Sequence, residues 1–113
     1  MKIYHNPRCS TSRKALKIIT DAGIEPEIIL YLKNALSPNE LEALLQKLEM
    51  APIDLIRKKE ALFKTEFKGT ERTDAEWIQI MIEHPRLMER PIVEHEGKAV
   101  VGRPLENVQE FMN

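Results

Sequence analysis

The 113-residue sequence contains a single cysteine, Cys9. One cysteine cannot form an internal disulfide bond, so the sequence excludes a small domain stabilised by disulfides. The three histidines do not fall into a recognisable zinc motif, and no second cysteine is present to complete one. We therefore expect no bound metal, and a cysteine that is either chemically reactive or simply apolar.

Long apolar runs and an excess of one charge are also missing. No stretch approaches the roughly 20 apolar residues of a membrane span, and the first residues lack the apolar region of a signal peptide. Seventeen lysines and arginines face eighteen aspartates and glutamates, which leaves no general basic surface for nucleic acid or an anionic membrane. We expect a cytoplasmic protein that binds neither nucleic acid nor a membrane. Any anion that it binds should be held by a few basic side chains at one site.

Length and composition favour one compact domain over residues 1–113. Hydrophobic residues make up 42% of the chain and charged residues 31%, which suits a globular core and not a disordered chain. No linker, internal repeat or low-complexity segment divides the sequence. A second domain is therefore not expected.

The order of the predicted elements is typical of a mixed α/β fold. In chain order, we predict a strand at 2–5, a helix at 12–22, a buried strand at 27–32, helices after capping boxes at Ser37 and Thr73, a hairpin at 91–101 and a helix at 105–111. The first two strands and the helix between them form a parallel unit. In the charged middle, the run from Arg57 to Glu60 is predicted to be a solvent-exposed helical face.

Cys9 lies between the first predicted strand and the first predicted helix, in a loop rich in arginine, serine and threonine. Its sulfur should therefore lie near free amide groups at the positive end of the helix, which favours the thiolate. Arg8 and Arg13 add positive charge, and an imidazolium at His5 can stabilise a thiolate. Most free cysteines are buried and unreactive, but this polar setting favours a nucleophile.

Two other thiol chemistries do not fit this loop. Phosphatase-like thiol enzymes place an arginine six residues after the cysteine, where this chain has Ala15. A dithiol oxidoreductase needs a second cysteine three residues after the first, where this chain has Ser12. The chain therefore cannot complete a disulfide cycle on its own, and it depends on an external thiol.

Four short motifs occur in a fixed order along the chain: His5–Arg13, Arg57, Arg90–Ile92 and Gly102–Pro104. Their order and spacing resemble the glutaredoxin-coupled arsenate reductase family, and the resemblance covers essentially the whole chain. It implies a thioredoxin-like mixed sheet with a helical insertion. It also suggests that the Arg90–Pro91 bond corresponds to the cis-proline of thioredoxin-like folds.

The resemblance implies three catalytic residues, which are Cys9, His5 and Ser12. It also implies three substrate-binding residues, which are Arg57, Arg90 and Arg103. In this assignment Cys9 is the nucleophile and the arginines bind a tetrahedral oxyanion, for which guanidinium groups offer several donors in a fixed geometry. Considered alone, each arginine is better explained as a solvated surface charge. Arg57, which lies in a run with two lysines, depends mainly on the resemblance.

The implied activity is reduction of arsenate to arsenite, with no bound cofactor, glutathione as co-substrate and glutaredoxin as protein partner. Two alternatives stay open. Spx-type regulators share this fold and contact RNA polymerase, but they usually carry a two-cysteine switch where this chain has Cys9 and Ser12. A thiol reductase of the same fold with another substrate also fits the motifs.

Overall fold

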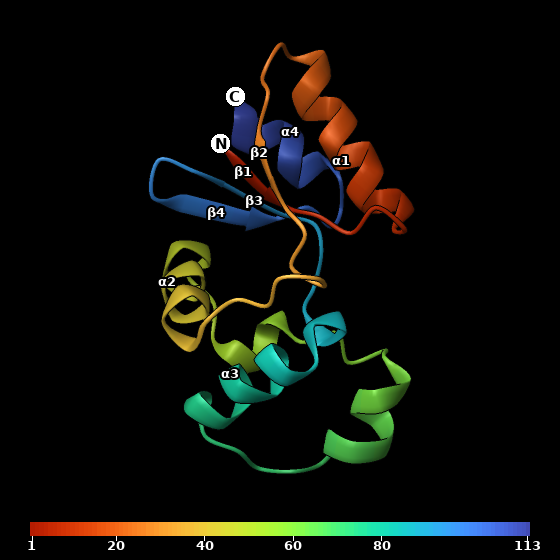
Figure 1. Ribbon diagram of the computed structural model, residues 1–113, viewed down its shortest axis with the longest axis vertical. Coiled ribbons are helices and arrows are strands. Elements are labelled where there is room, and N and C mark those ends of the chain that lie inside the picture. The colour runs from red at the N-terminus through yellow and green to blue at the C-terminus, as the bar shows by residue number, and fades with distance from the viewer. The chain divides into compact units, whose positions relative to one another are not determined.

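The computed structural model describes residues 1–113 and separates into two compact units. The first unit combines Met1–Asn34 with Arg90–Asn113, and the second is Ala35–Glu89. The second unit is mostly helical and interrupts the first in sequence, which is the arrangement expected of a helical insertion (Figure 1). The expectation of one domain over residues 1–113 stays a prediction.

The first unit is built around a four-stranded mixed sheet in the order β2-β1-β3-β4 (Figure 1). The strands are β1 (Lys2–Tyr4), β2 (Glu27–Ile29), β3 (Ile92–His95) and β4 (Lys98–Val101). β1 pairs in parallel with β2 and antiparallel with β3, which forms a hairpin with β4. Glu96 and Gly97 connect the hairpin with φ values of 50° and 80°, as a two-residue hairpin turn requires. The predicted hairpin is therefore confirmed.

β2 is shorter and more exposed than the sequence predicted. The strand predicted at 27–32 ends early because the chain turns at Leu30, whose carbonyl accepts a 3.0 Å hydrogen bond from the amide of Asn34. β2 is also an edge strand beside β1, and Ile28 and Leu32 are 47% and 41% exposed. The prediction of a buried strand is wrong, because a short apolar run does not distinguish a central strand from an edge strand.

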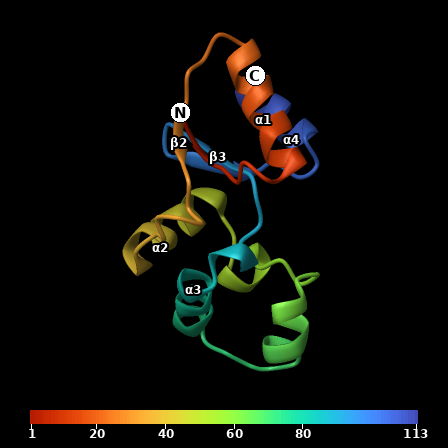
Figure 2. The ribbon, with the colours of Figure 1, turned by 45° about the vertical axis from the view of Figure 1, so that its right-hand side comes forward.

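Two helices contribute to the core on one face of the sheet. α1 (Ser10–Asp21) follows β1, α4 (Glu106–Met112) closes the chain, and the two lie side by side in both views (Figures 1 and 2). The fully buried core joins both helices to β1 and β3 through Ile3, Ala15, Ile19, Val93 and Val108. This core holds α1 against the sheet, and with it the loop that carries Cys9.

The second unit contains α2 (Pro38–Leu48), η1 (Pro52–Leu55), η2 (Phe63–Phe67), α3 (Asp74–Glu83) and η3 (Pro85–Leu87). Both predicted capping boxes are present. The Ser37 and Thr73 hydroxyls accept hydrogen bonds from the amides of Glu40 and Glu76 at 3.1 and 3.2 Å, and the glutamate carboxylates accept from the cap amides at 2.9 Å. None of the helices of the protein combines the length and apolar character that a membrane span requires.

The predicted helical face from Arg57 to Glu60 is wrong, because this segment lies outside the helices. Ile56, just before it, forms an antiparallel bridge with Met88. The amide of Arg57 donates a 2.7 Å hydrogen bond to the carbonyl of Leu87. Pairing with a segment some thirty residues away therefore fixes the backbone here, and local composition does not reveal such pairing.

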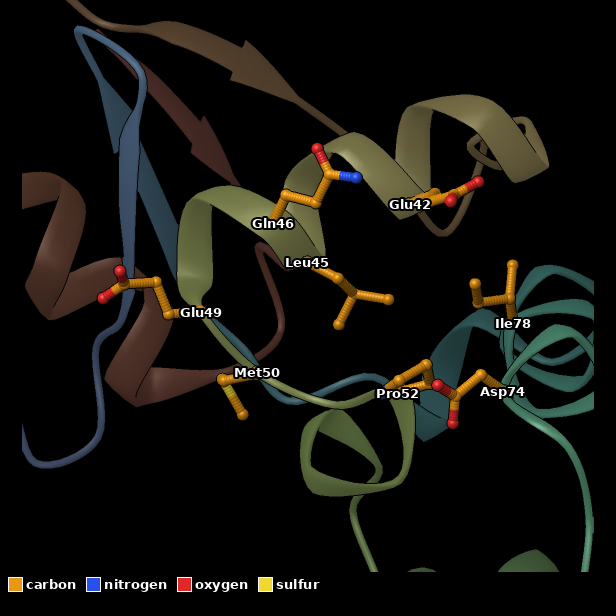
Figure 3. Close-up of a pocket in the computed structure, with 8 residues that line it drawn as sticks. All are labelled: Glu42, Leu45, Gln46, Glu49, Met50, Pro52, Asp74 and Ile78. Atoms are coloured by element: carbon orange, nitrogen blue, oxygen red, sulfur yellow. The ribbon is translucent and has the colours of Figure 1, made fainter.

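A surface pocket of about 280 Å³ lies between α2 and α3 (Figure 3). Its lining combines apolar and acidic side chains: Glu42, Leu45, Gln46, Glu49, Met50, Pro52, Asp74 and Ile78. None of the residues predicted to act in catalysis or oxyanion binding lines this pocket. With three carboxyl groups and no basic side chain in its lining, it is a poor site for an oxyanion.

Candidate functional site

Cys9 is the N-cap residue of α1, at the point where the loop after β1 enters the helix. Its amide donates a 3.0 Å hydrogen bond to the carbonyl of Asn6, and its carbonyl accepts a 3.0 Å bond from the amide of Arg13. The backbone of Cys9 is thus held from both sides. Its side chain is partly exposed, and its sulfur lies at the amino end of α1, where amide groups lack partners within the helix.

The surroundings of Cys9 lower the pKa of its thiol. Burial raises this pKa, but hydrogen bonds from the amide of Ser12 and the side chain of Arg90, the positive charge of Arg103 and the amide of Thr11 together outweigh the burial. All four favourable interactions stabilise the negative sulfur. The thiolate is therefore more populated near neutral pH than in an ordinary cysteine.

The guanidinium group of Arg103 contacts two neighbours through different nitrogen atoms. Its Nη2 atom lies 3.2 Å from the sulfur of Cys9, and its Nε atom donates a 2.7 Å hydrogen bond to the carbonyl of Arg90. The second bond orients the guanidinium plane, which leaves its other N–H groups available to a substrate. Asn107 supports this segment by donating to the carbonyls of Arg103 and Val101 at 3.2 and 3.1 Å.

The β3–β4 hairpin explains why two arginines far apart in sequence meet at one sulfur. Arg90 precedes β3 and Arg103 follows β4, and the hairpin register pairs Ile92 with Val101 at this end of the two strands. The amide of Gly102 also donates a 2.8 Å hydrogen bond to the carbonyl of Pro91. The Arg90–Pro91 and Arg103–Pro104 peptide bonds are both cis, and the first matches the cis-proline that the family resemblance suggested.

Gly102 occupies a position where a side chain does not fit. A Cβ atom at this residue would lie 2.9 Å from a ring carbon of Pro91 and 2.9 Å from a methyl carbon of Val108. Both neighbours belong to well-packed parts of the first unit, so a larger residue would push β4 away from α4. Gly102 therefore lets the chain pass close to Pro91, and this path places the next residue, Arg103, beside Cys9.

His5 and Ser12 contact each other. The Nδ1 atom of His5 lies 2.6 Å from the hydroxyl oxygen of Ser12, which also accepts a 3.1 Å hydrogen bond from the amide of Asn6. Burial, and to a smaller extent the charge of Arg13, lowers the pKa of His5, so its ring is neutral near neutral pH. The Ser12 hydroxyl can then donate to the unprotonated Nδ1 atom. This arrangement favours a positioning role for His5 over the imidazolium that the sequence suggested.

Arg57, the third predicted oxyanion ligand, belongs to the second unit. Its Nη1 atom forms a 3.2 Å ion pair with Glu60, and its side chain is 21% exposed. The role of Arg57 in binding an oxyanion stays a prediction. The other predicted residues, which are Cys9, His5, Ser12, Arg90 and Arg103, all lie in the first unit.

Comparison with known proteins identifies the family. The model of the ArsC family matches residues 4–111, which is nearly the full length. The chain belongs to the ArsC family. The uncharacterized protein YfgD of Escherichia coli K12 is 44% identical over 99% of this chain and 96% of its own length. A Neisseria meningitidis protein named arsenate reductase is 40% identical over 99% of this chain and 97% of its own length.

A solved structure confirms the predicted fold class for this ArsC-family protein. The arsenate reductase from Vibrio cholerae matches it with a TM-score of 0.90 and 41% identity, over 96% of this chain and 94% of that one. The thioredoxin-like α/β fold and the family resemblance inferred from the motifs are thus confirmed.

Sequence reasoning missed one residue of the ArsC-family site, Asn6. Its side-chain oxygen accepts a 3.0 Å hydrogen bond from the amide of Arg8, and its own carbonyl accepts from the amide of Cys9. This is an Asx turn, and Asn6-Pro7 is a known signal for such a turn. The sequence therefore contained a local signal for this turn.

No metal site can be assembled from the side chains of the protein. No group of three or more histidine, cysteine, aspartate or glutamate side chains lies close enough together to hold an ion. The sequence-based expectation of no metal stays a prediction.

Proposed function

We propose that this ArsC-family protein reduces arsenate to arsenite with Cys9 as the nucleophile. The observation that carries the proposal is the meeting of Arg90 and Arg103 at a partly exposed cysteine whose pKa they help to lower. The sulfur is suited to attack an electrophile, and the guanidinium groups are suited to hold oxyanion oxygens beside it. Relatives named arsenate reductase, at 40 and 41% identity, support arsenate as the substrate.

In the first step, the Cys9 thiolate attacks arsenic. A sulfur–arsenic bond forms, an arsenic–oxygen bond breaks, and the oxygen leaves as water after taking up protons. Arg90 and Arg103 would offset the charge on the remaining oxygens, and Arg57 is the further oxyanion ligand that the family resemblance implies. Arsenic stays pentavalent in this adduct, so no electrons have yet been transferred.

The electrons must come from other molecules, because the chain has no second cysteine to form a disulfide with Cys9. Glutathione sulfur replaces a second arsenic oxygen, which also leaves as water. A glutaredoxin thiolate then attacks the glutathione sulfur and forms a mixed disulfide. The arsenic–sulfur bond to glutathione breaks, and its electron pair stays on arsenic, which becomes trivalent.

Hydrolysis of the remaining bond to Cys9 releases arsenite and restores the free thiol. A second glutathione reduces the mixed disulfide on glutaredoxin, so two glutathione molecules supply the two electrons. The scheme needs no bound cofactor, because glutathione acts as a co-substrate. It also fits a cytoplasmic location, where the glutathione pool keeps a lone thiol reduced.

The proposal is tested with purified protein, arsenate, glutathione, a glutaredoxin, glutathione reductase and NADPH. Arsenite is separated and measured by chromatography with arsenic detection, and NADPH oxidation is followed in parallel. We expect arsenite and oxidised NADPH in equal amounts, with loss of turnover when either glutathione or glutaredoxin is omitted.

Two results would contradict the proposal in different ways. Arsenite formation without glutaredoxin at the full rate would refute the glutaredoxin step. No arsenite, together with NADPH oxidation that a glutathione mixed disulfide drives when this protein is present and glutaredoxin is left out, would instead indicate a thiol reductase with another substrate.

A further inference from the structure

A pocket of about 390 Å³ adjoins the Cys9 loop within the first unit. It lies between the segment that follows β1 and the turn that follows β2, and it is lined by His5, Asn6, Pro7, Arg8, Leu30, Leu32 and Lys33. We refer to these seven residues as the loop pocket. Arg8 is the residue directly before Cys9, so their Cα atoms lie about 3.8 Å apart. The pocket can therefore hold a small molecule at the loop segment directly before Cys9 in the chain.

The charges of the loop pocket are of one sign. Arg8 and Lys33 are exposed, neither forms an ion pair with another side chain, and no carboxylate lines the pocket. Two free cations beside one cavity favour a ligand with carboxylate groups.

The rest of the lining is partly apolar. Leu30 is half-buried and Leu32 is 41% exposed, and both contribute to the wall. Apolar side chains at the wall suit an organic ligand better than a small inorganic oxyanion, which would have to lose water there without gaining hydrogen bonds. The loop pocket thus combines cationic groups, an apolar wall and a lining residue, Arg8, that directly precedes Cys9 in the chain.

We propose that the loop pocket binds the thiol co-substrate, a small peptide thiol of the glutathione class, with its carboxylates toward Arg8 and Lys33. This inference rests on the proposed function, because the reaction needs an external thiol beside Cys9. Arg8 and Lys33 act in this proposal as co-substrate ligands, whereas Arg90 and Arg103 serve the oxyanion. The two substrates would therefore be held by different basic side chains of the first unit.

The test measures binding without any redox chemistry. S-methylglutathione keeps both carboxylates but has no thiol, so it cannot react with Cys9. We expect that titrating it into the full-length protein, without arsenate, shifts the backbone amide NMR signals of Asn6, Leu32 and Lys33. Arg8→Glu and Lys33→Glu should each raise the Kd for S-methylglutathione about three- to tenfold. Each substitution replaces one exposed ion pair with a carboxylate by a repulsion between two negative charges.

Lys98→Glu is the matched control. Lys98 is an exposed lysine of β4, the edge strand on the side of the sheet opposite β2, and the substitution makes the same change in charge. The Kd of this variant should equal that of the wild-type protein. The diester of S-methylglutathione should bind the wild-type and Arg8→Glu proteins with the same weak affinity, because it lacks the carboxylates.

Three results would overturn the proposal. They are amide shifts that lie outside the loop pocket, an equal loss of affinity in Lys98→Glu, and full competition by inorganic phosphate, which would mark the pocket as an inorganic anion site. The binding experiment is independent of arsenate reduction. Normal binding of S-methylglutathione without arsenite formation would reject the proposed function and keep the pocket assignment. Arsenite formation without binding of S-methylglutathione would keep the proposed function and reject the pocket assignment.

Discussion

Replacing Arg103 with lysine should lower catalytic efficiency toward arsenate without unfolding the protein. The Arg103 guanidinium bridges the sulfur of Cys9 at 3.2 Å and the carbonyl of Arg90 at 2.7 Å through two different nitrogens. Lysine keeps the charge, but its single nitrogen cannot hold the same planar orientation between these two groups. Loss of one charge-assisted hydrogen bond costs about 1.5–3 kcal/mol. That energy corresponds to a fall of about tenfold to a hundredfold in kcat/KM.

Steady-state kinetics over a range of arsenate concentrations measures this effect. Circular dichroism and thermal unfolding serve as the control for folding. Arg72→Lys is a matched control in the second unit, where Arg72 stacks on Phe67 at 5.0 Å and belongs to no predicted site. Wild-type kcat/KM in a folded Arg103→Lys protein would refute the assignment of this guanidinium to the oxyanion.

Three further predictions concern the Cys9 loop. Alkylation of Cys9 by iodoacetamide should show an inflection below the free-cysteine pKa of about 8.5, because the loop lowers this pKa, and an inflection at that value would exclude activation. Ser12→Ala should lower the free energy of unfolding by about 1–3 kcal/mol in urea, since it removes the partner of His5 and Asn6, and an unchanged midpoint would contradict this. An NMR titration should give His5 a pKa below 6.5. The folded state then binds fewer protons than the unfolded state, so stability should fall as the pH drops from about 6.5 through the folded-state pKa, and a rise would refute this.

The parts of the fold that depend on local signals could be predicted from the sequence. The capping boxes at Ser37 and Thr73 marked the starts of α2 and α3, because each box satisfies the free amides of its own helix. The hairpin turn at Glu96-Gly97 was equally clear, since glycine readily adopts the positive φ that such a turn requires.

The errors arose where partners distant in sequence decide the structure. Nothing local to Ile56 indicates that its backbone pairs with Met88, and this pairing excludes the helix that composition favoured for the next residues. In the same way, the apolar run that begins at Glu27 does not reveal that β2 lies at the sheet edge with Ile28 exposed. Strand order is set by the whole sheet, and a single strand sequence carries little of that information.

The candidate site was predictable to different degrees. The place of Cys9 at the start of α1 followed from the strand–loop–helix pattern, and that pattern also explains the amides that lower its pKa. The two-residue turn fixes the register of the hairpin, so the sequence already placed Arg90 and Arg103 at the same end of its two strands. Their meeting at Cys9 also depends on the pairing of β3 with β1, and in the sequence that part rested on the family resemblance alone. The neutral state predicted for His5 follows from burial, which the sequence does not show.

The most direct test of the central claim compares arsenite formation by the wild-type protein and by Cys9→Ser in the complete glutathione and glutaredoxin assay. Serine keeps the size and position of the side chain but is a far weaker nucleophile at neutral pH. If Cys9 forms the bond to arsenic, the wild-type protein accumulates arsenite over many turnovers, and the folded Cys9→Ser variant gives no more than the protein-free background. Arsenite formation by Cys9→Ser at the wild-type rate would contradict a catalytic role for Cys9.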